Sequence, residues 1–328
     1  MGKLKRLILD NRVLYNLLRN IVDEISTIQL SIFMKKIRKN KNFIEKMKKN
    51  KKYIIIEKGK YNYKTFSAFY LNNMLALVLK NLLNGYIPIV KYKTNSRDEK
   101  SNNWSDFFLQ PVSDLPDNIE KKYILNEECI NSRFKPSFSM IYSKKKLKLW
   151  GMIYNEFIKF NSDMTNYFED EYNSILKGKR VLGVICRGTD YTATKPKYHP
   201  IQPDIEEIIN EAQELLNAKD YDYIYLATEE EKYYQKFIEK FGKDCILTNK
   251  RTYYGEMYNQ LDDNSLLYSV NFERENDQYL KGKEYLSSLK LLSCCNSLIG
   301  GHCGGSDLAL YFNNCKYEYV HIYDKGVY

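Results

Sequence analysis

The stretch VLGVICRGTDY, residues 181–191, is a run of apolar and partly β-branched residues followed directly by an arginine and a glycine. A short apolar run of this kind predicts a strand buried in a sheet. Arg187 stands at the end of that strand. Burying a guanidinium without a partner is costly, whereas its planar fork of donors matches a carboxylate or a phosphate. Its partner is therefore an anion, supplied either by the chain, with Asp190 as the candidate, or by a bound ligand.

Strands and helices alternate regularly on the C-terminal side of Arg187. This alternation predicts an α/β fold with a parallel sheet, helices on both faces, and ligands bound beyond the carboxyl ends of the strands. The expected strands are 180–186, 221–228, 244–248, 296–300 and 317–323, and the expected helices are 204–218, 229–241, 279–295 and 306–314.

The N-terminal half is predicted to begin its ordered core with a βαβ unit. Residues 52–92 contain an apolar run, a glycine-containing loop, a long apolar helix that ends at Gly85, and a second apolar run. Residues 102–118 contain clustered aromatic side chains and two prolines and are expected to form a packed loop, and residues 144–176 are expected to be helical. At 328 residues, the chain favours two domains. The expected divisions are a basic N-terminal segment 1–52, a first lobe 53–176 and a second lobe 177–328.

The basic charge is concentrated in one short segment. Of the net charge of +10, residues 35–52 contribute +9, because they contain ten Lys or Arg and one Glu. A basic face that follows a nucleic-acid backbone is therefore not indicated. A local patch facing an anionic surface, or a solvated helix end, fits this distribution.

Upstream of this basic segment, apolar residues recur at the spacing of an amphipathic helix. Two interpretations remain open, a helix packed on the protein's own core and a helix lying on a membrane surface. No apolar run is long enough to span a bilayer. We expect a cytoplasmic protein, peripheral to the inner membrane face under the second interpretation. The recurring residues are Leu4, Leu7, Ile8, Leu14, Leu17, Leu18, Ile21, Ile25, Ile28 and Ile32.

The cysteines and acidic residues do not indicate a metal site. Seven cysteines without a CxxC pair, together with three histidines, favour buried reduced thiols over a zinc site or a disulfide framework. Residues 220–222, Asp-Tyr-Asp, have the DxD form used by some metal-dependent glycosyltransferases, but they precede a strand instead of ending one. No metal or other cofactor is expected.

Two further segments follow predicted strands. Thr228, Glu229 and Glu230 come after the second strand of the second lobe, where an acidic residue can accept from a ribose hydroxyl or a base N–H group, or can favour the start of a helix. Residues 299–310, IGGHCGGSDLAL, follow the fourth strand; their four glycines allow backbone N–H groups to converge on an anion, and Ser306 or Asp307 is expected to cap the next helix.

These segments resemble a known family. The runs CRGTDYTATKPKYHPIQ (186–202), YIYLATEEE (223–231) and the segment 279–312 are similar, in order and spacing, to three motifs of the fucosyltransferase superfamily, notably the α1,6-fucosyltransferases. The resemblance covers roughly residues 180–313 and implies a GT-B fold, in which two Rossmann-like lobes face a cleft. Residues 84–90 and 102–111 more loosely resemble bacterial surface-polysaccharide glycosyltransferases.

The resemblance implies a role for each matching residue. Arg187 would bind the nucleotide diphosphate and stabilise it as it leaves, Glu229 would contact the guanine of a GDP-sugar, and Thr228 would line the phosphates. The glycine loop would line the phosphates too, through Gly304, Gly305 and Ser306. The chain departs from the family pattern at Ile185, Gly188 and Lys195, where the family has a histidine, a second arginine and a catalytic glutamate.

An inverting transfer also requires a base for the acceptor hydroxyl. Asp190 and His199 are the local candidates, and the first lobe is a further source of the base. Lys195, which occupies the position of the catalytic glutamate, and Lys197 would hold an acidic sugar or an additional phosphate, or would be solvated.

The expected function is a metal-independent inverting glycosyltransferase. It would move fucose or a related sugar from a GDP-sugar to a glycan or lipid-linked glycan of the bacterial cell surface. This function assumes that a bound ligand, and not the chain, supplies the counter-ion of Arg187. The alternatives are the same fold with another nucleotide-sugar donor, and a non-catalytic protein that binds a nucleotide or a polyanion.

Overall fold

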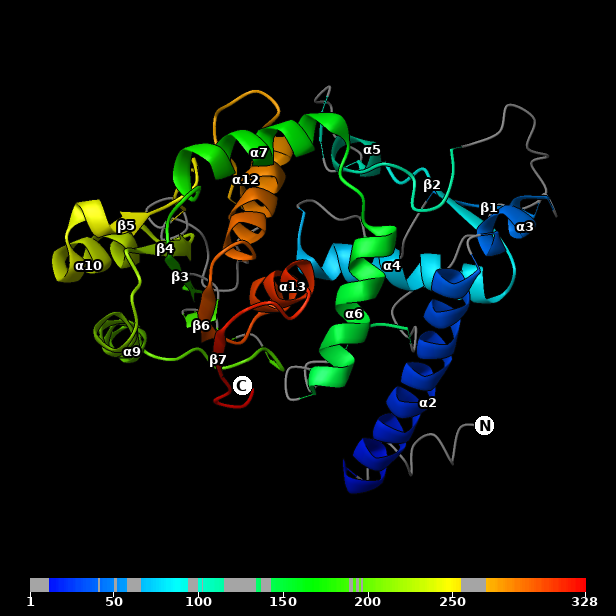
Figure 1. The fold of residues 1–328 in the computed structure, drawn as a ribbon, viewed down its shortest axis with the longest axis horizontal. Helices are drawn as coiled ribbons and strands as arrows, with labels where there is room; N and C mark the ends of the chain where they lie inside the picture. The colour runs from blue at the N-terminus through cyan, green and yellow to red at the C-terminus, as the bar shows by residue number, and fades with distance from the viewer. Residues whose placement is uncertain are drawn as a thin grey trace.

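The computed structural model describes residues 12–40, 42–49, 52–57, 66–93, 100–101, 103–114, 134–136, 143–188, 191–192, 195, 197–254 and 270–328. Its largest sheet has five parallel strands in the order β5-β4-β3-β6-β7, as Figure 1 shows on the left of the molecule. These strands are β3 (Val181–Cys186), β4 (Tyr223–Thr228), β5 (Ile246–Leu247), β6 (Ser297–Gly301) and β7 (Tyr319–Tyr323). The predicted α/β class and all five strands are confirmed.

Helices cover both faces of this sheet, as the alternation predicted. On β3, Leu182, Val184 and Cys186 point to one face, and they share a buried cluster with residues of α9 (Ile205–Ala218) and α10 (Glu231–Phe241). Val181 and Ile185 point to the other face, and they share a second cluster with α12 (Asp277–Leu292) and α13 (Gly304–Asn313). Because both faces are covered, β3 is buried along its whole length. A short 3-10 helix, η4 (Lys243–Cys245), precedes β5.

The predicted βαβ unit of the N-terminal half is also confirmed. Strands β1 (Tyr53–Ile56) and β2 (Ile87–Val90) pair in parallel through the crossover helix α4 (Ala68–Leu83). Ser67 caps α4 by accepting a hydrogen bond from the backbone N–H of Tyr70. The helix is followed by Gly85 in the left-handed region (φ +82°), a conformation that glycine adopts at no steric cost.

Three further helices connect the two sheets. The predicted helical region 144–176 is divided into α6 (Lys144–Phe157) and α7 (Ser162–Ile175), with Asn161 as the N-cap of α7. The predicted packed loop contains the short helix α5 (Trp104–Phe107), whose two end residues are completely buried. Helix α6 packs on α13, where the rings of Tyr154 and Tyr311 stack 4.9 Å apart. One buried cluster thus continues from α4 through α6 to the sheet.

Helix α2 (Arg12–Lys39) packs against α6 on the side away from α13, and α3 (Phe43–Lys49) follows it (Figure 1). Helix α2 packs on the protein's own core, as one of the two interpretations expected, but the recurring apolar residues named for it do not make this contact: the six whose side chains are described are 37–56 % exposed. A different set of residues, Leu30, Phe33, Met34 and Ile37, faces the core. The six exposed residues are Leu17, Leu18, Ile21, Ile25, Ile28 and Ile32.

Within the part of the chain that the structure describes, no helix combines the length and the apolar character that crossing a bilayer requires. No disulfide joins the six cysteines of this part. Cys186, Cys295 and Cys303 are buried as expected, whereas Cys294 and Cys315 are exposed, so the expectation of buried thiols is wrong for these two.

Strand β6 lies in the interior of the sheet, and a cavity there should destabilise the fold. Leu298 on β6 is fully buried, and its register partner Val320 on β7 is 42 % exposed. We expect Leu298→Ala to lower the free energy of unfolding by about 2–5 kcal/mol and Val320→Ala by less than about 1 kcal/mol. Urea unfolding of both variants measures this difference. Equal losses would contradict the described position of β6.

Candidate functional site

The carboxyl ends of β4, β3 and β6 lie side by side, because these strands are neighbours in a parallel sheet. Arg187 follows β3, Glu229 and Glu230 follow β4, and the glycine loop follows β6. The structure therefore brings together at one edge three segments that are far apart in the sequence. This is the edge at which open α/β sheets bind their ligands.

An ion pair joins Arg187 to Glu229. The guanidinium Nη1 lies 3.0 Å from Oε2 of Glu229, with the two side chains 17 % and 5 % exposed. The other carboxylate oxygen, Oε1, accepts a hydrogen bond of 2.9 Å from the backbone N–H of Gly188. Strand register produces this pairing, because Cys186 lies opposite Thr228 and the next residue of each strand is Arg187 or Glu229.

The chain itself thus supplies a counter-ion to Arg187, and the expectation that only a bound ligand would do so is wrong. The internal candidate named from the sequence, Asp190, lies outside the described residues. Glu229 was expected to contact a nucleobase, yet both of its carboxylate oxygens are engaged by the segment 187–188. In this structure, Glu229 holds the arginine in position.

Gly188 is packed against the second acid of this edge. A Cβ atom at position 188 would lie 2.5 Å from Cγ of Glu230, a separation that real Cβ atoms do not show. The Glu230 side chain is itself 3 % exposed and lies 3.3 Å from Nζ of Lys232. The hydroxyl of Thr228, which was expected to line the phosphates, accepts a hydrogen bond from the backbone N–H of Glu230. No larger residue fits at position 188 unless Glu230 moves.

The glycines of residues 300–305 are required mainly by close packing. Gly300 has φ +145°, and a Cβ on it would overlap the carbonyl oxygen of Ile185. A Cβ on Gly301 would overlap the amide of Gln202, whose Nε2 donates a hydrogen bond of 2.8 Å to the carbonyl oxygen of His302. The protein's own atoms therefore surround the first half of the loop.

The second half of the loop forms the first turn of helix α13, which begins at Gly304, two residues earlier than predicted. The N-cap is Cys303, not Ser306 or Asp307. Ser306 still takes part, because its hydroxyl accepts from the backbone N–H of Cys303 at 2.9 Å and donates to the carbonyl oxygen of Cys303 at 2.8 Å. The backbone N–H groups of Gly304 and Gly305 have no acceptor among the described residues, as expected for the first turn of a helix.

The starts of α13 and α4 face each other at this edge. A Cβ on Gly304 would lie 2.6 Å from Cβ of Ala68, the first residue of α4. Because a helix N-terminus carries partial positive charge and unpaired N–H groups, two of them in contact favour an anion beside them. This feature could not be read from the sequence, since 236 residues separate the two positions.

Arg187 lies close to this pair of helix starts. Burial raises the pKa of the Cys303 thiol, and the positive charge of Arg187 opposes that rise. The same charge opposes the effect of burial on the pKa of Tyr285, which also has a backbone hydrogen bond with Ala68. Tyr285 comes from α12 and was missed in the sequence, where it looks like one more aromatic residue of an apolar helix.

The loop after Arg187 brings one predicted residue near the ion pair. Cζ of Arg187 lies 5.0 Å from the ring centroid of Tyr191, and the Tyr191 ring lies 5.3 Å from that of His199. His199 is half-buried, and its carbonyl oxygen accepts from the backbone N–H of Tyr328. Lys195 and Lys197 are exposed, and Lys195 has φ +45°.

A second arginine follows the neighbouring strand β5 and was not singled out from the sequence. The backbone N–H of Tyr254 donates a hydrogen bond of 3.0 Å to the carbonyl oxygen of Glu229, which ties the segment after β5 to the site. The charge of Arg251 opposes the effect of burial on the pKa of Tyr254, so the two side chains are close. Nε of Arg251 is buried and has no hydrogen-bond partner in the described part of the chain.

Acidic and thiol groups do not gather into a metal site in the described residues, where no group of three or more His, Cys, Asp or Glu side chains could hold an ion. The DxD segment lies at the amino ends of the strands, whereas Arg187 lies at their carboxyl ends. There, the carboxylate of Asp222 accepts a hydrogen bond of 2.9 Å from the backbone N–H of Arg180, just before β3. Its placement before a strand agrees with the sequence interpretation.

Neither a protein-family model nor a curated protein matches the chain. Among solved structures, it is similar to NodZ α-1,6-fucosyltransferase soaked with GDP-fucose, at 13 % sequence identity and a TM-score of 0.43, over 80 % of this chain and 92 % of that chain. It is similar to the fucosyltransferase NodZ from Bradyrhizobium at 13 % identity and a TM-score of 0.42, with the same coverage. It is also similar to POFUT1 in its apo form, at 9 % identity and a TM-score of 0.34, over 54 % of this chain and 49 % of that chain.

The ion pair predicts unequal effects of two neighbouring substitutions. In Glu229→Gln, the uncharged side chain can no longer neutralise Arg187, and its single carbonyl oxygen must serve both donors. We expect the free energy of unfolding to fall by about 1–3 kcal/mol. Glu231→Gln removes an exposed carboxylate two residues away and should change it by less than about 0.5 kcal/mol. Urea denaturation measures both values, and a similar result for the two variants would argue against the structural importance of the pair.

Proposed function

We propose that this protein is a metal-independent inverting glycosyltransferase that transfers fucose or a related sugar from a GDP-sugar to a glycan of the bacterial cell surface. The sequence motifs around Arg187, Thr228 and the glycine loop support this assignment. The observation that carries it is the position of Arg187, beyond the carboxyl end of the central strand β3 and close to Cys303, the N-cap residue of α13.

Transfer breaks the bond between the anomeric carbon and the diphosphate, which leaves with the electron pair. Negative charge therefore grows on the diphosphate as the reaction proceeds. Donors that are fixed before the reaction stabilise this charge without reorganising. In our proposal these donors are the guanidinium of Arg187 and the N–H groups of Gly304 and Gly305, with Ser306 fixing the turn that presents them.

Glu229 has a positioning role in this mechanism. A guanidinium has five N–H donors, and the contact with Glu229 orients one side of the fork while other donors serve the diphosphate. This role differs from the guanine contact that the family resemblance implies. We propose that the base is instead read by other groups of the same edge, and Arg251, four residues beyond β5, is a candidate.

The acceptor would bind on the side of the N-terminal unit. The βαβ unit of β1, α4 and β2 would form part of a first lobe, and the sheet of β3 to β7 would form the second lobe of a GT-B enzyme. The start of α4 at Ala68 lies against the start of α13 at Gly304. A sugar bound to the diphosphate at this place would face the N-terminal unit. We propose a glycan or lipid-linked glycan as the acceptor.

For the general base we propose His199. The base must remove the acceptor proton as the new bond to the anomeric carbon forms, and histidine has a suitable ordinary pKa. The Tyr191 ring lies 5.0 Å from Cζ of Arg187 and 5.3 Å from the ring of His199, and these contacts support an imidazole on the same side of the site as the proposed leaving group. Lys195 and Lys197, both exposed, would meet an acidic or phosphorylated part of the acceptor.

A nucleotide panel tests the donor class. Thermal unfolding is followed with GDP, UDP, ADP and CMP at equal concentrations. Saturation at 100 times the dissociation constant stabilises the folded state by about 2.7 kcal/mol, so a specific ligand gives a clear shift. We expect GDP to raise the melting temperature most. A shift with another nucleotide alone would move the proposal to another donor, and a response to heparin alone would favour a polyanion-binding protein.

Arg187→Lys should abolish sugar transfer while preserving the fold. Lysine keeps the charge but loses the fork that both Glu229 and a diphosphate require. We expect nucleotide release from the donor to fall by roughly 10²–10³-fold. The matched control is Arg180→Lys, at the other end of β3, where Arg180 forms an exposed two-bond contact with Glu318. Near-normal turnover in Arg187→Lys would remove the mechanism.

His199→Gln should separate proton transfer from donor binding. We expect transfer to fall by about 10²–10⁴-fold, with an unchanged thermal shift on GDP. His321→Gln changes a partly exposed histidine that contacts Glu211 and should retain activity. Asp190→Asn is assayed beside them. Loss of transfer in that variant, together with normal rates in His199→Gln, would reassign the base.

A further inference from the structure

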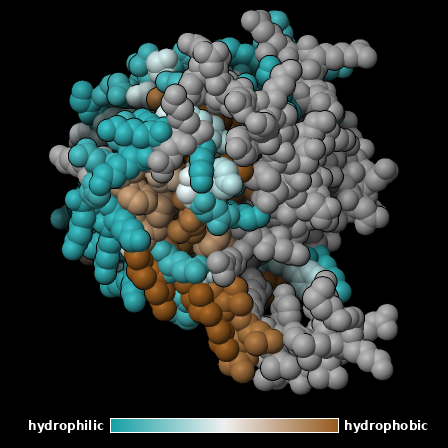
Figure 2. Space-filling view, turned by 90° about the vertical axis from the view of Figure 1, so that its right-hand side faces the viewer, coloured by the Kyte–Doolittle hydropathy of each residue, from teal (hydrophilic) through white to brown (hydrophobic). Residues whose placement is uncertain are grey.

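Helix α2 presents an apolar stripe to solvent. Seven apolar side chains between positions 17 and 32 are 37–56 % exposed, and Figure 2 shows a continuous hydrophobic band on this side of the molecule. Apolar residues are normally scattered on the surface, whereas a contiguous exposed stripe marks an interaction site. The seven residues are Leu17, Leu18, Ile21, Val22, Ile25, Ile28 and Ile32.

These residues occupy one face of the helix. At roughly 100° per residue, the seven positions fall within an arc of about 140° and extend about 22 Å along the axis. The residues that pack against the rest of the protein, Leu30, Phe33, Met34 and Ile37, lie on the opposite face. The helix is therefore apolar on two sides, and the packing with α6 accounts for only one of them.

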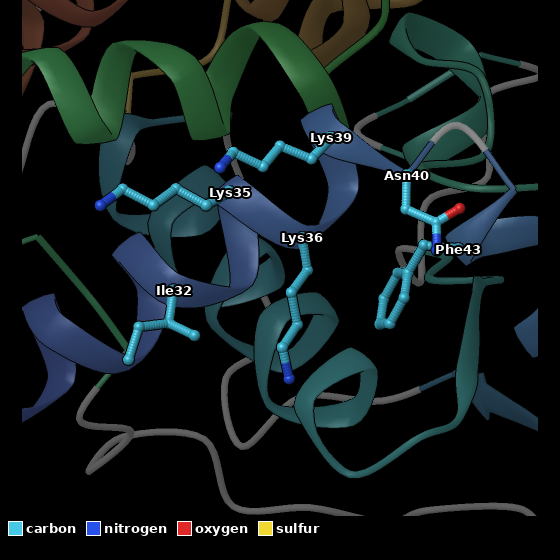
Figure 3. Close-up of a pocket in the computed structure, with 6 residues that line it drawn as sticks. All are labelled: Ile32, Lys35, Lys36, Lys39, Asn40 and Phe43. Carbon is cyan, nitrogen blue, oxygen red and sulfur yellow. The ribbon is translucent and has the colours of Figure 1, made fainter.

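The same exposed face becomes basic at the end of the helix. Lys35, Lys36 and Lys39 fall within the arc of the apolar stripe and are all exposed. With Ile32, Asn40 and Phe43, they line a shallow, open groove where α2 turns into α3. Figure 3 shows that the amino groups of Lys35 and Lys39 extend in the same direction from successive turns.

Acidic groups do not cancel this basic end among the described residues of α2. The only acids of α2 are Asp23 and Glu24, at least eleven residues before Lys35. Glu24, at the margin of the stripe, is neutralised by Lys146 of α6, with 2.5 Å between Oε1 and Nζ. Helix α3 adds Lys46, Lys48 and Lys49 against Glu45. The face thus combines an apolar stripe with a net positive charge at one end.

We propose that this face of α2 docks the protein on the surface of an anionic lipid bilayer. The apolar stripe enters the boundary between headgroups and acyl chains, and Lys35, Lys36 and Lys39 contact lipid phosphates. Charge complementarity selects this partner over a second copy of the chain. The described face of α2 offers its lysines no unpaired acid, since Glu24 at its margin is already paired with Lys146, whereas an anionic bilayer offers phosphates. The proposal is independent of the transfer reaction, since α6 separates α2 from α13 and the sheet (Figure 1).

Vesicle flotation tests the basic part of this surface. The full-length protein is mixed with two kinds of vesicle. One kind is phosphatidylcholine alone, and the other contains about 30 mol % phosphatidylglycerol, an anionic lipid. We expect binding to the anionic vesicles and weak binding to the neutral ones. Lys35→Gln/Lys39→Gln should weaken the partition coefficient about 10- to 30-fold. The control Lys240→Gln/Lys243→Gln removes two exposed charges near α10 and should bind normally.

The apolar part is tested with Ile25→Ser/Ile28→Ser, which removes two exposed side chains without touching the core. This variant should lose vesicle binding about 10-fold or more while keeping the melting temperature and nucleotide release of the parent protein. The proposal is overturned if no vesicle binds the parent protein, or if neutral and anionic vesicles bind it equally. It is also overturned if light scattering detects a dimer that Ile25→Ser/Ile28→Ser abolishes. If the parent protein binds anionic vesicles but transfers no sugar, the proposed reaction is contradicted and the proposed docking surface is not.

Discussion

The contact between Arg187 and Glu229 is the interaction on which the candidate site depends. A cation at the end of a fully buried strand requires an anion nearby, because its desolvation is not compensated otherwise. Glu229 supplies that anion and is itself fixed by the backbone N–H of Gly188. The pair therefore closes the tips of β3 and β4 and orients a guanidinium.

The rest of the edge is organised around the same place. Gly188 gives room to the buried side chain of Glu230, and the glycines of the next loop give room to Ile185, Gln202 and Ala68. Small residues here let three strands and two helix starts approach one another closely. The result is a concentration of backbone N–H groups and one guanidinium. Such a constellation favours a diphosphate, and it is the physical basis of the function that we propose.

Helix α2 illustrates a different constraint. A helix that packs on a protein needs one apolar face, and a second apolar face is destabilising in water unless something covers it. Its inner face packs on α6, whereas the outer face combines isoleucines and leucines with lysines at one end. A lipid surface matches both parts of this face at once. The proposed donor site and the proposed docking surface lie on opposite sides of α6, so we expect that each can be disrupted without the other.

The sequence by itself determined the α/β class, the five strands, the βαβ unit and the three segments that follow strand ends. Local patterns specify these features, since apolar runs, helical periodicity and glycines act within a few residues. The partner of Arg187, the N-cap of α13, the contact between Ala68 and Gly304 and the part played by Tyr285 were decided by the tertiary structure alone. Each depends on strand register or on the packing of distant segments. The same holds for α2, because its periodicity predicted an amphipathic helix, but only packing decided which apolar face is buried and which meets solvent.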